Sequence, residues 1–139
     1  MIYLLGETSK QINFTTQVKF LYRSEFIDTL VAHLDVTGGN YYFLSLTHGI
    51  LSPSAELSPY RLKTLSEKGR QTWGILAHSM ITRFIPNDDK KICLLYSGGR
   101  FISLEKRLAE SGYKIYDPVR HFSSDNLKLQ WFYSKMIKA

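Results

Sequence analysis

The sequence predicts an α/β fold: a single three-layer domain with a mostly parallel central sheet of about four strands, flanked by helices. Four short apolar runs are each bounded by Gly, Ser, Asn, Asp or Pro, as strands are. Longer stretches with apolar residues at helical spacing separate these runs. Continuous rather than alternating hydrophobicity indicates strands covered on both faces, and alternation with helices favours a parallel sheet.

The predicted strands are the apolar runs Ile2–Leu5, Tyr42–Leu46, Ile92–Tyr96 and Tyr113–Tyr116. Between the first two runs, an apolar stripe extends from Val18 to Leu34 and predicts one helix. Thr15 or Thr16 is its expected N-cap, because a hydroxyl at that position can accept a backbone N–H bond.

Three further helices follow. The second begins after the cap residue Ser66 and ends before Pro86, which cannot continue a helix. The third covers residues 101–110 and stops at Ser111-Gly112, a typical C-terminal signal. The last, at residues 124–137, starts with a Ser-Ser-Asp cap.

Composition places the whole chain, residues 1–139, in one globular domain, because 44% of its residues are hydrophobic. The lone cysteine, Cys93, lies in an apolar run and is expected in the core. A single cysteine fits a reducing compartment, and no run is long enough to span a membrane, so we expect a cytoplasmic protein. The four histidines lack metal-ligand spacings, and no cofactor motif is present, so neither a metal nor a cofactor is expected.

The net charge of +6 and the pI near 9.4 indicate a basic surface that attracts polyanions. DNA, RNA or a nucleotide is therefore an expected partner. The alternative is a generic basic surface that only confers solubility. The basic residues are spread along the chain, and none of their clusters is as dense as a nucleic-acid-binding arm.

A hydroxyl-rich loop follows the second strand within residues 41–60. Ser45, His48 and Ser52 can supply a nucleophile, a base and an orienting hydroxyl, and Gly49 allows close approach of a ligand. Ligands bind at strand ends in open α/β sheets, so this loop is a predicted site. The alternative is that Ser45 and Thr47 bond nearby backbone groups while His48 packs at a sheet edge.

The turn Ser58-Pro59-Tyr60-Arg61 is a second candidate. Proline fixes the local backbone, and a presented Tyr60 beside Arg61 can stack on a base and pair with a phosphate. A purely structural turn, with Tyr60 covering the rim of the core, explains the same residues.

A third candidate joins the third strand to the third helix. Gly98, Gly99 and Arg100 lie at a strand-to-helix turn, where backbone N–H groups and an arginine can hold a phosphate. Neither GxGxxG nor GxxxxGK[ST] is present, and an ordinary turn also accounts for the glycines.

A fourth candidate follows the last strand. Asp117 and His121 lie at the same kind of strand end as His48, and a carboxylate near a histidine can activate water. In a doubly wound sheet these loops converge on one crevice. Helix capping by Ser123, Ser124 or Asp125 is the expected use of the residues that follow.

Four segments together resemble an uncharacterised bacterial and phage family, domain of unknown function 6884: LYRSEF at 21–26, FLSLTHGILSPSAELSPYRL at 43–62, YSGGRF at 96–101 and DPVRHFSSDNLKLQW at 117–131. Three positions depart from the family pattern. Gly6, Glu7 and Thr8 occupy the region of an early cysteine, Thr47 replaces a frequent lysine, and Phe101 stands near a usual tyrosine. If these positions serve catalysis in the family, the resemblance implies that this member is altered or inactive.

The central segment is also distantly similar to a motif of the peroxide-stress DNA-binding proteins, and the strand order more weakly resembles uracil-DNA-glycosylase-like folds. Both similarities imply an association with nucleic acid or its bases.

These patterns lead to one main hypothesis: a domain associated with nucleic acid or nucleotides that processes a base or a glycosidic bond. Ser45, His48 and Tyr60 would line the pocket, Arg100 would hold phosphate, and His48 or Asp117 would position water. One alternative is a small-molecule Ser/His hydrolase. Another is a non-enzymatic interaction module, monomeric or homodimeric, carried on a mobile element.

Overall fold

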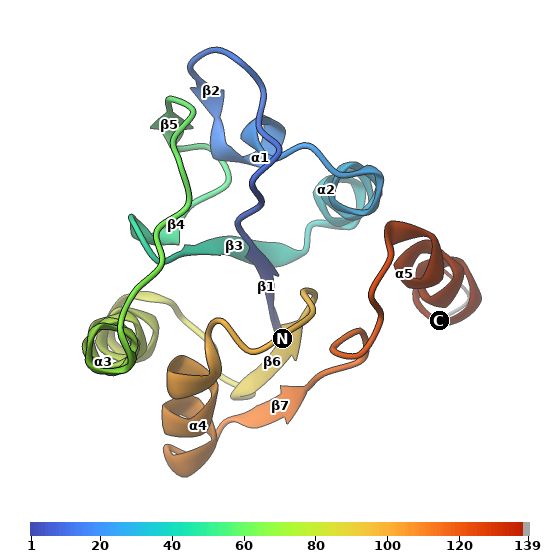
Figure 1. Ribbon diagram of the computed structural model, residues 1–139. Coiled ribbons are helices and arrows are strands. Elements are labelled where there is room, and N and C mark those ends of the chain that lie inside the picture. The colour runs from blue at the N-terminus through green and yellow to red at the C-terminus, as the bar shows by residue number, and fades with distance from the viewer. Residues whose placement is uncertain (138–139) are drawn as a thin grey trace.

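Five strands form one sheet in the computed structural model, which describes residues 1–137 (Figure 1). The sheet order is β4-β3-β1-β6-β7, with β1 (Ile2–Gly6), β3 (Asn40–Ser45), β4 (Gly49–Leu51), β6 (Lys91–Leu94) and β7 (Lys114–Tyr116). β1 pairs in parallel with β3 and β6, and β6 pairs in parallel with β7. The predicted mostly parallel sheet is therefore confirmed.

Helices cover both faces of this sheet (Figure 1). α2 (Glu25–Thr37) and α5 (Asp125–Trp131) lie on one face, and α3 (Glu67–Phe84) and α4 (Ile102–Glu110) on the other. A π-helical turn, η1 (Phe132–Met136), continues α5. The prediction of a three-layer α/β domain is confirmed. Within residues 1–137, no helix combines the length and the hydrophobicity that a membrane crossing requires.

The helix predicted from Val18 to Leu34 is divided. α1 (Val18–Leu21) ends at Tyr22, whose backbone is extended, and α2 begins only at Glu25. The predicted N-caps, Thr15 and Thr16, were wrong. Ser24 is the N-cap of α2, and its Oγ accepts a hydrogen bond from the Ile27 N–H at 3.3 Å. Tertiary pairing explains the difference. β2 (Thr16–Gln17) pairs antiparallel with β5 (Glu56–Leu57), and the Thr15 hydroxyl contacts that of Ser58.

The predicted starts of α3 and α5 and the predicted end of α4 are confirmed. The Ser66 and Ser124 hydroxyls cap α3 and α5, and α4 ends at Glu110, with Ser111 as its C-cap before Gly112 at a φ of +90°. The last predicted helix, residues 124–137, is α-helical only as far as Trp131 and continues as η1. β4, however, was not predicted. After β3 the chain reverses into an antiparallel strand, and Gly49, with a φ of +82°, allows this reversal.

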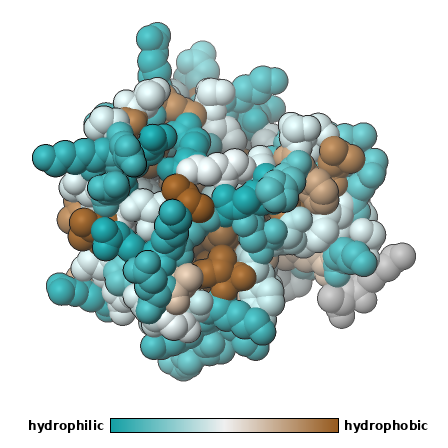
Figure 2. All heavy atoms as spheres, turned by 60° about the horizontal axis from the view of Figure 1, so that its bottom comes forward, coloured by the Kyte–Doolittle hydropathy of each residue, from teal (hydrophilic) through white to brown (hydrophobic). Residues whose placement is uncertain are grey.

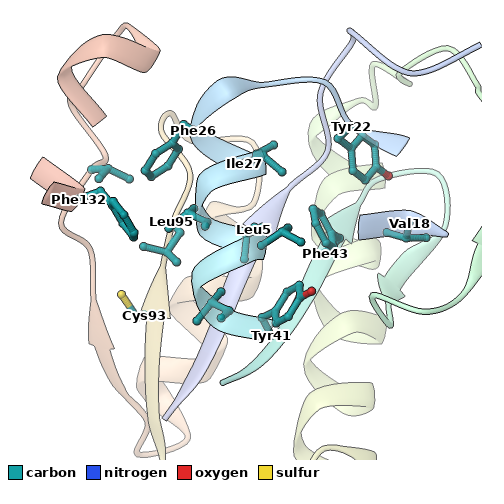
Figure 3. Packing of buried hydrophobic residues seen from close by; sticks show 14 of the residues in the cluster. Leu5, Val18, Tyr22, Phe26, Ile27, Tyr41, Phe43, Cys93, Leu95 and Phe132 are labelled. Atoms are coloured by element: carbon teal, nitrogen blue, oxygen red, sulfur yellow. The ribbon is translucent and has the colours of Figure 1, made fainter. Parts of the chain in front are cut away.

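Two apolar clusters hold the layers together. The larger one packs α2, α5 and η1 against the sheet and contains Leu5, Phe43 and Cys93, the last of these buried as predicted (Figure 3). The second packs α3 and α4 against the opposite face. On the face seen in Figure 2, the surface is mainly hydrophilic and the hydrophobic side chains gather in separate patches.

The strand order creates a topological switch point. After β1 the chain passes to α2 on one face, whereas after the neighbouring strand β6 it passes to α4 on the other face. The carboxyl ends of β1 and β6 therefore lie side by side while their connections diverge. Open α/β sheets bind ligands in the crevice that such a divergence leaves.

Gly74 provides a test of the packing between α3 and α4. A Cβ at this position would lie 2.7 Å from Ser103 Cβ and 3.1 Å from Leu104 N, both in the facing helix. We expect Gly74→Ala to destabilise the protein by about 1–3 kcal/mol, the usual cost of overpacking, in urea unfolding.

The matched control is Gly99→Ala. A Cβ at Gly99 meets nothing within 4 Å, and its φ lies outside the left-handed region. An equal loss of stability in both variants would contradict close packing at Gly74.

Candidate functional site

A cavity of about 360 Å³ opens at the switch point. We call it the crevice. Its floor comes from the carboxyl ends of two neighbouring strands, at Gly6–Thr8 after β1 and Leu95–Ser97 after β6. The first residues of α2 and α5 and the turn before α4 form its walls. Of the loops predicted to converge, the one after β6 lines the crevice, whereas the loops that carry His48 and Asp117 do not.

The charged side chains of the crevice are mainly basic. Four of them are cationic and two are acidic: Lys10, Arg23, Arg100 and Lys128, against Glu7 and Asp125. Asp125 Oδ2 accepts a hydrogen bond of 2.8 Å from the Ser24 hydroxyl, which ties the start of α5 to the start of α2. The crevice therefore presents an excess of positive charge to a ligand.

Glu7 is the centre of a buried polar network. Its side chain has no exposed surface, and burial of a carboxylate requires compensating donors. Oε1 accepts a bond from the Tyr60 hydroxyl at 2.6 Å. Oε2 accepts bonds from the Leu46 N–H at 2.9 Å and from Arg100 Nη2 at 2.7 Å. Three segments far apart in the sequence thus meet at one carboxylate.

The Tyr60 hydroxyl extends this network. It lies 2.6 Å from the Tyr22 hydroxyl and 3.1 Å from Ser45 Oγ. Burial and the hydrogen bond to Glu7 raise the pKa of Tyr60 to about 12. Burial and the contact with Tyr60 likewise raise the pKa of Tyr22 above its usual range. Both hydroxyls therefore stay neutral and hydrogen-bonded at physiological pH.

Ser45 is fully buried and closes a turn. Its Oγ accepts bonds from the backbone N–H groups of Thr47 at 3.2 Å and His48 at 3.0 Å. Its carbonyl accepts a bond from Trp73 Nε1. His48 is exposed, and its ring meets the Tyr60 ring edge-on at 4.6 Å. This geometry corresponds to the structural alternative, in which Ser45 bonds nearby backbone groups, rather than to a nucleophile and base.

Asp117 belongs to a second network. Arg120 forms ion pairs with both Asp117 and the buried Glu105, and Tyr96 donates a bond of 2.7 Å to Glu105. Arg120 Nη1 also donates to the Gly98 carbonyl at 2.7 Å. These contacts fasten the turn before α4 to the loop after β7, so Asp117 has a positioning role in this geometry.

The structure brings together part of the predicted set. Tyr60 and Arg100 meet at Glu7, with Ser45 beside them. Of the predicted site residues, Arg100 lines the crevice. The others lie outside its lining: Ser45, His48, Tyr60, Arg61, Gly98, Gly99, Asp117 and His121.

Sequence reasoning missed Glu7, Lys10, Arg23, Asp125 and Lys128 as site residues. One signal was available for Glu7, because an acidic residue directly after a buried parallel strand lies where ligands bind. Within residues 1–137, no group of three or more His, Cys, Asp or Glu side chains is arranged to hold a metal ion.

Tyr60→Phe tests the network around Glu7. The substitution leaves the buried Oε1 without its 2.6 Å donor, so we expect a loss of about 1.5–3 kcal/mol in urea unfolding. Tyr133→Phe is the matched control, because Tyr133 is 56% exposed. If the wild type and Tyr60→Phe were equally stable, the buried Glu7 carboxylate would not hold this network together.

Alkaline pH provides a second test. Burial raises the pKa of five tyrosines, Tyr3, Tyr22, Tyr41, Tyr60 and Tyr96. Below about pH 10 both the folded and the unfolded states are protonated, so the stabilising contribution is complete. Above pH 10 the unfolded state ionises first, and stability should fall as the pH approaches 12, the value of Tyr60.

Tyrosinate absorbance can follow this ionisation in the native protein and in urea. We expect part of the native signal to titrate at higher pH than the unfolded signal, and the urea midpoint to fall in the same interval. Superimposable titration curves with an unchanged midpoint would contradict the buried hydroxyl network.

Comparison with known proteins agrees with the resemblance noted in the sequence. Residues 2–134 match the model of a family described as "Family of unknown function (DUF6884)". No curated protein and no solved structure matches the chain. Because the match covers nearly all of the 139 residues, the protein belongs to the DUF6884 family.

Proposed function

We propose that the crevice binds a phosphate-bearing ligand: a nucleotide, or a nucleotide unit of DNA or RNA. The observation that carries this proposal is the excess of cationic side chains around a cavity at the switch point of a parallel sheet. A basic crevice at this position suits an anion, because its positive charge attracts a ligand of opposite charge.

The ion pairing supports an anionic ligand. Within residues 1–137, Lys10, Arg23 and Lys128 form no salt bridge, although all three line the crevice. Arg100 pairs with Glu7 through Nη2, but its Nε is buried without a hydrogen-bond partner among the same residues. A buried donor without an acceptor is costly, and a ligand oxygen or a water would satisfy it.

The size of the crevice suits one nucleotide. Its volume of about 360 Å³ lies within the usual range of small-molecule sites, about 300–1,000 Å³. Phe26, Tyr96 and Phe101 belong to its lining, but their side chains are almost fully buried and offer a base little surface. The cationic side chains at the rim are therefore what the crevice offers to a ligand.

The geometry supports binding better than a named reaction. Three donors already occupy the Glu7 carboxylate, and Ser45 is buried and engaged in a turn. Processing of a base or a glycosidic bond would need a carboxylate at the ligand, and Asp125 is the crevice residue that offers one. We therefore propose binding, without a catalytic step.

Lys10→Ala and Arg23→Ala test this proposal. Each variant should lose about tenfold in affinity for adenosine 5′-monophosphate, as expected for one charge-assisted phosphate contact. Adenosine, which lacks the phosphate, should bind more weakly than the nucleotide and respond less to either substitution. Fluorescence or calorimetric titration at two salt concentrations measures these differences.

The matched control is Arg83→Ala, because Arg83 is an exposed cation in the last turn of α3, away from the crevice. Its affinity should equal that of the wild type. If adenosine and its monophosphate bind equally well, or if Arg83→Ala has the same effect as Arg23→Ala, the crevice is not a phosphate site.

A further inference from the structure

Two more hollows adjoin the crevice. The first, of about 510 Å³, shares Ser9 with the crevice and is also lined by Tyr60 and Arg61. The second, of about 580 Å³, lies between α3 and α4 and reaches Gly99, next to Arg100 of the crevice. The crevice is thus the middle of three neighbouring hollows, which we call the edge track.

Both outer hollows carry cations. Arg61 is exposed in the first, and the second contains Arg70, Lys106 and Arg107 against Glu67 and Glu110. None of these six side chains forms an ion pair within the part of the chain that the structure describes. Positive charge therefore continues beyond the crevice in both directions.

Gly99 lines the hollow between α3 and α4 and directly precedes Arg100 of the crevice. An added Cβ would contact nothing within 4 Å, and its φ lies outside the left-handed region, unlike the +81° of Gly98. Neither packing nor backbone conformation therefore requires a glycine at position 99. A missing side chain there lets a ligand backbone pass close to the protein.

We propose that the edge track binds a single strand of nucleic acid longer than one nucleotide. This inference rests on the proposed function: one nucleotide occupies the crevice. The strand then continues over Gly99 towards Lys106 and over Ser9 towards Arg61. A strand with unpaired bases can place one base in a cavity of about 360 Å³, whereas a duplex holds its bases inside the helix.

The test compares thymidine monophosphate with thymidine oligomers of about eight nucleotides, within the site sizes usual for single-strand binders. Fluorescence anisotropy at several salt concentrations measures both affinities. We expect the oligomer to bind at least about tenfold more tightly and with a steeper salt dependence, because it neutralises more cations. Deoxy and ribo oligomers then distinguish a DNA ligand from an RNA ligand.

Variants of the track separate the strand from the single nucleotide. Arg70→Ala and Lys106→Ala should lower the affinity for the oligomer about fivefold to tenfold and leave the affinity for the monophosphate unchanged. Gly99→Ala should weaken oligomer binding without lowering the thermal midpoint, since its Cβ has room. Arg83→Ala, at the other end of α3, should change neither affinity.

The outcomes distinguish this inference from the proposed function. Equal affinities for monophosphate and oligomer, or oligomer binding that Arg70, Lys106 and Gly99 variants leave unchanged, would overturn the strand proposal alone. Tighter binding of a duplex of the same length would also overturn it. If Arg23→Ala affects neither ligand, both proposals fail.

Discussion

The Glu7 carboxylate is buried at the end of the first strand, and a buried charge is tolerated only with donors around it. Those donors come from the turn after β3, from the segment after β5 and from the turn before α4. At these positions the three segments belong to no helix or strand. Their common attachment to Glu7 therefore sets the shape of the edge where the crevice opens.

A second buried carboxylate, Glu105, likewise joins separate segments, in this case the turn before α4 and the loop after β7. Arg120 joins it to Asp117 and to the carbonyl of Gly98, so the turn before α4 is held from two directions. Arg100 pairs with one carboxylate, Glu7, and Arg120 pairs with two, Glu105 and Asp117. Lys10, Arg23 and Lys128 form no ion pair within residues 1–137, so their charges are not neutralised inside the protein. These three unpaired cations explain why the crevice is basic.

Local sequence patterns predicted most of the elements. Three helix ends were predicted correctly, at Ser66, Ser111 and Ser124, because capping depends on residues only a few positions apart. The break between α1 and α2 could not be predicted in this way. Tyr22 is extended and buried there, with its hydroxyl against Tyr60, a contact across 38 residues. The antiparallel strand β4 was missed, because its short run shows no clear alternation of apolar and polar residues.

The sequence by itself determined the α/β class and the parallel strands, because hydrophobic periodicity and turn chemistry act over short distances, and its motifs carried the family resemblance. Only the tertiary structure decided that Tyr60 and Arg100 meet at Glu7, and that Asp117 pairs with Arg120 instead of facing the crevice. Strand order places β6 beside β1, and no local pattern contains that order. Ion pairs and buried hydrogen bonds follow from it, because they join residues that only the folded chain brings within reach.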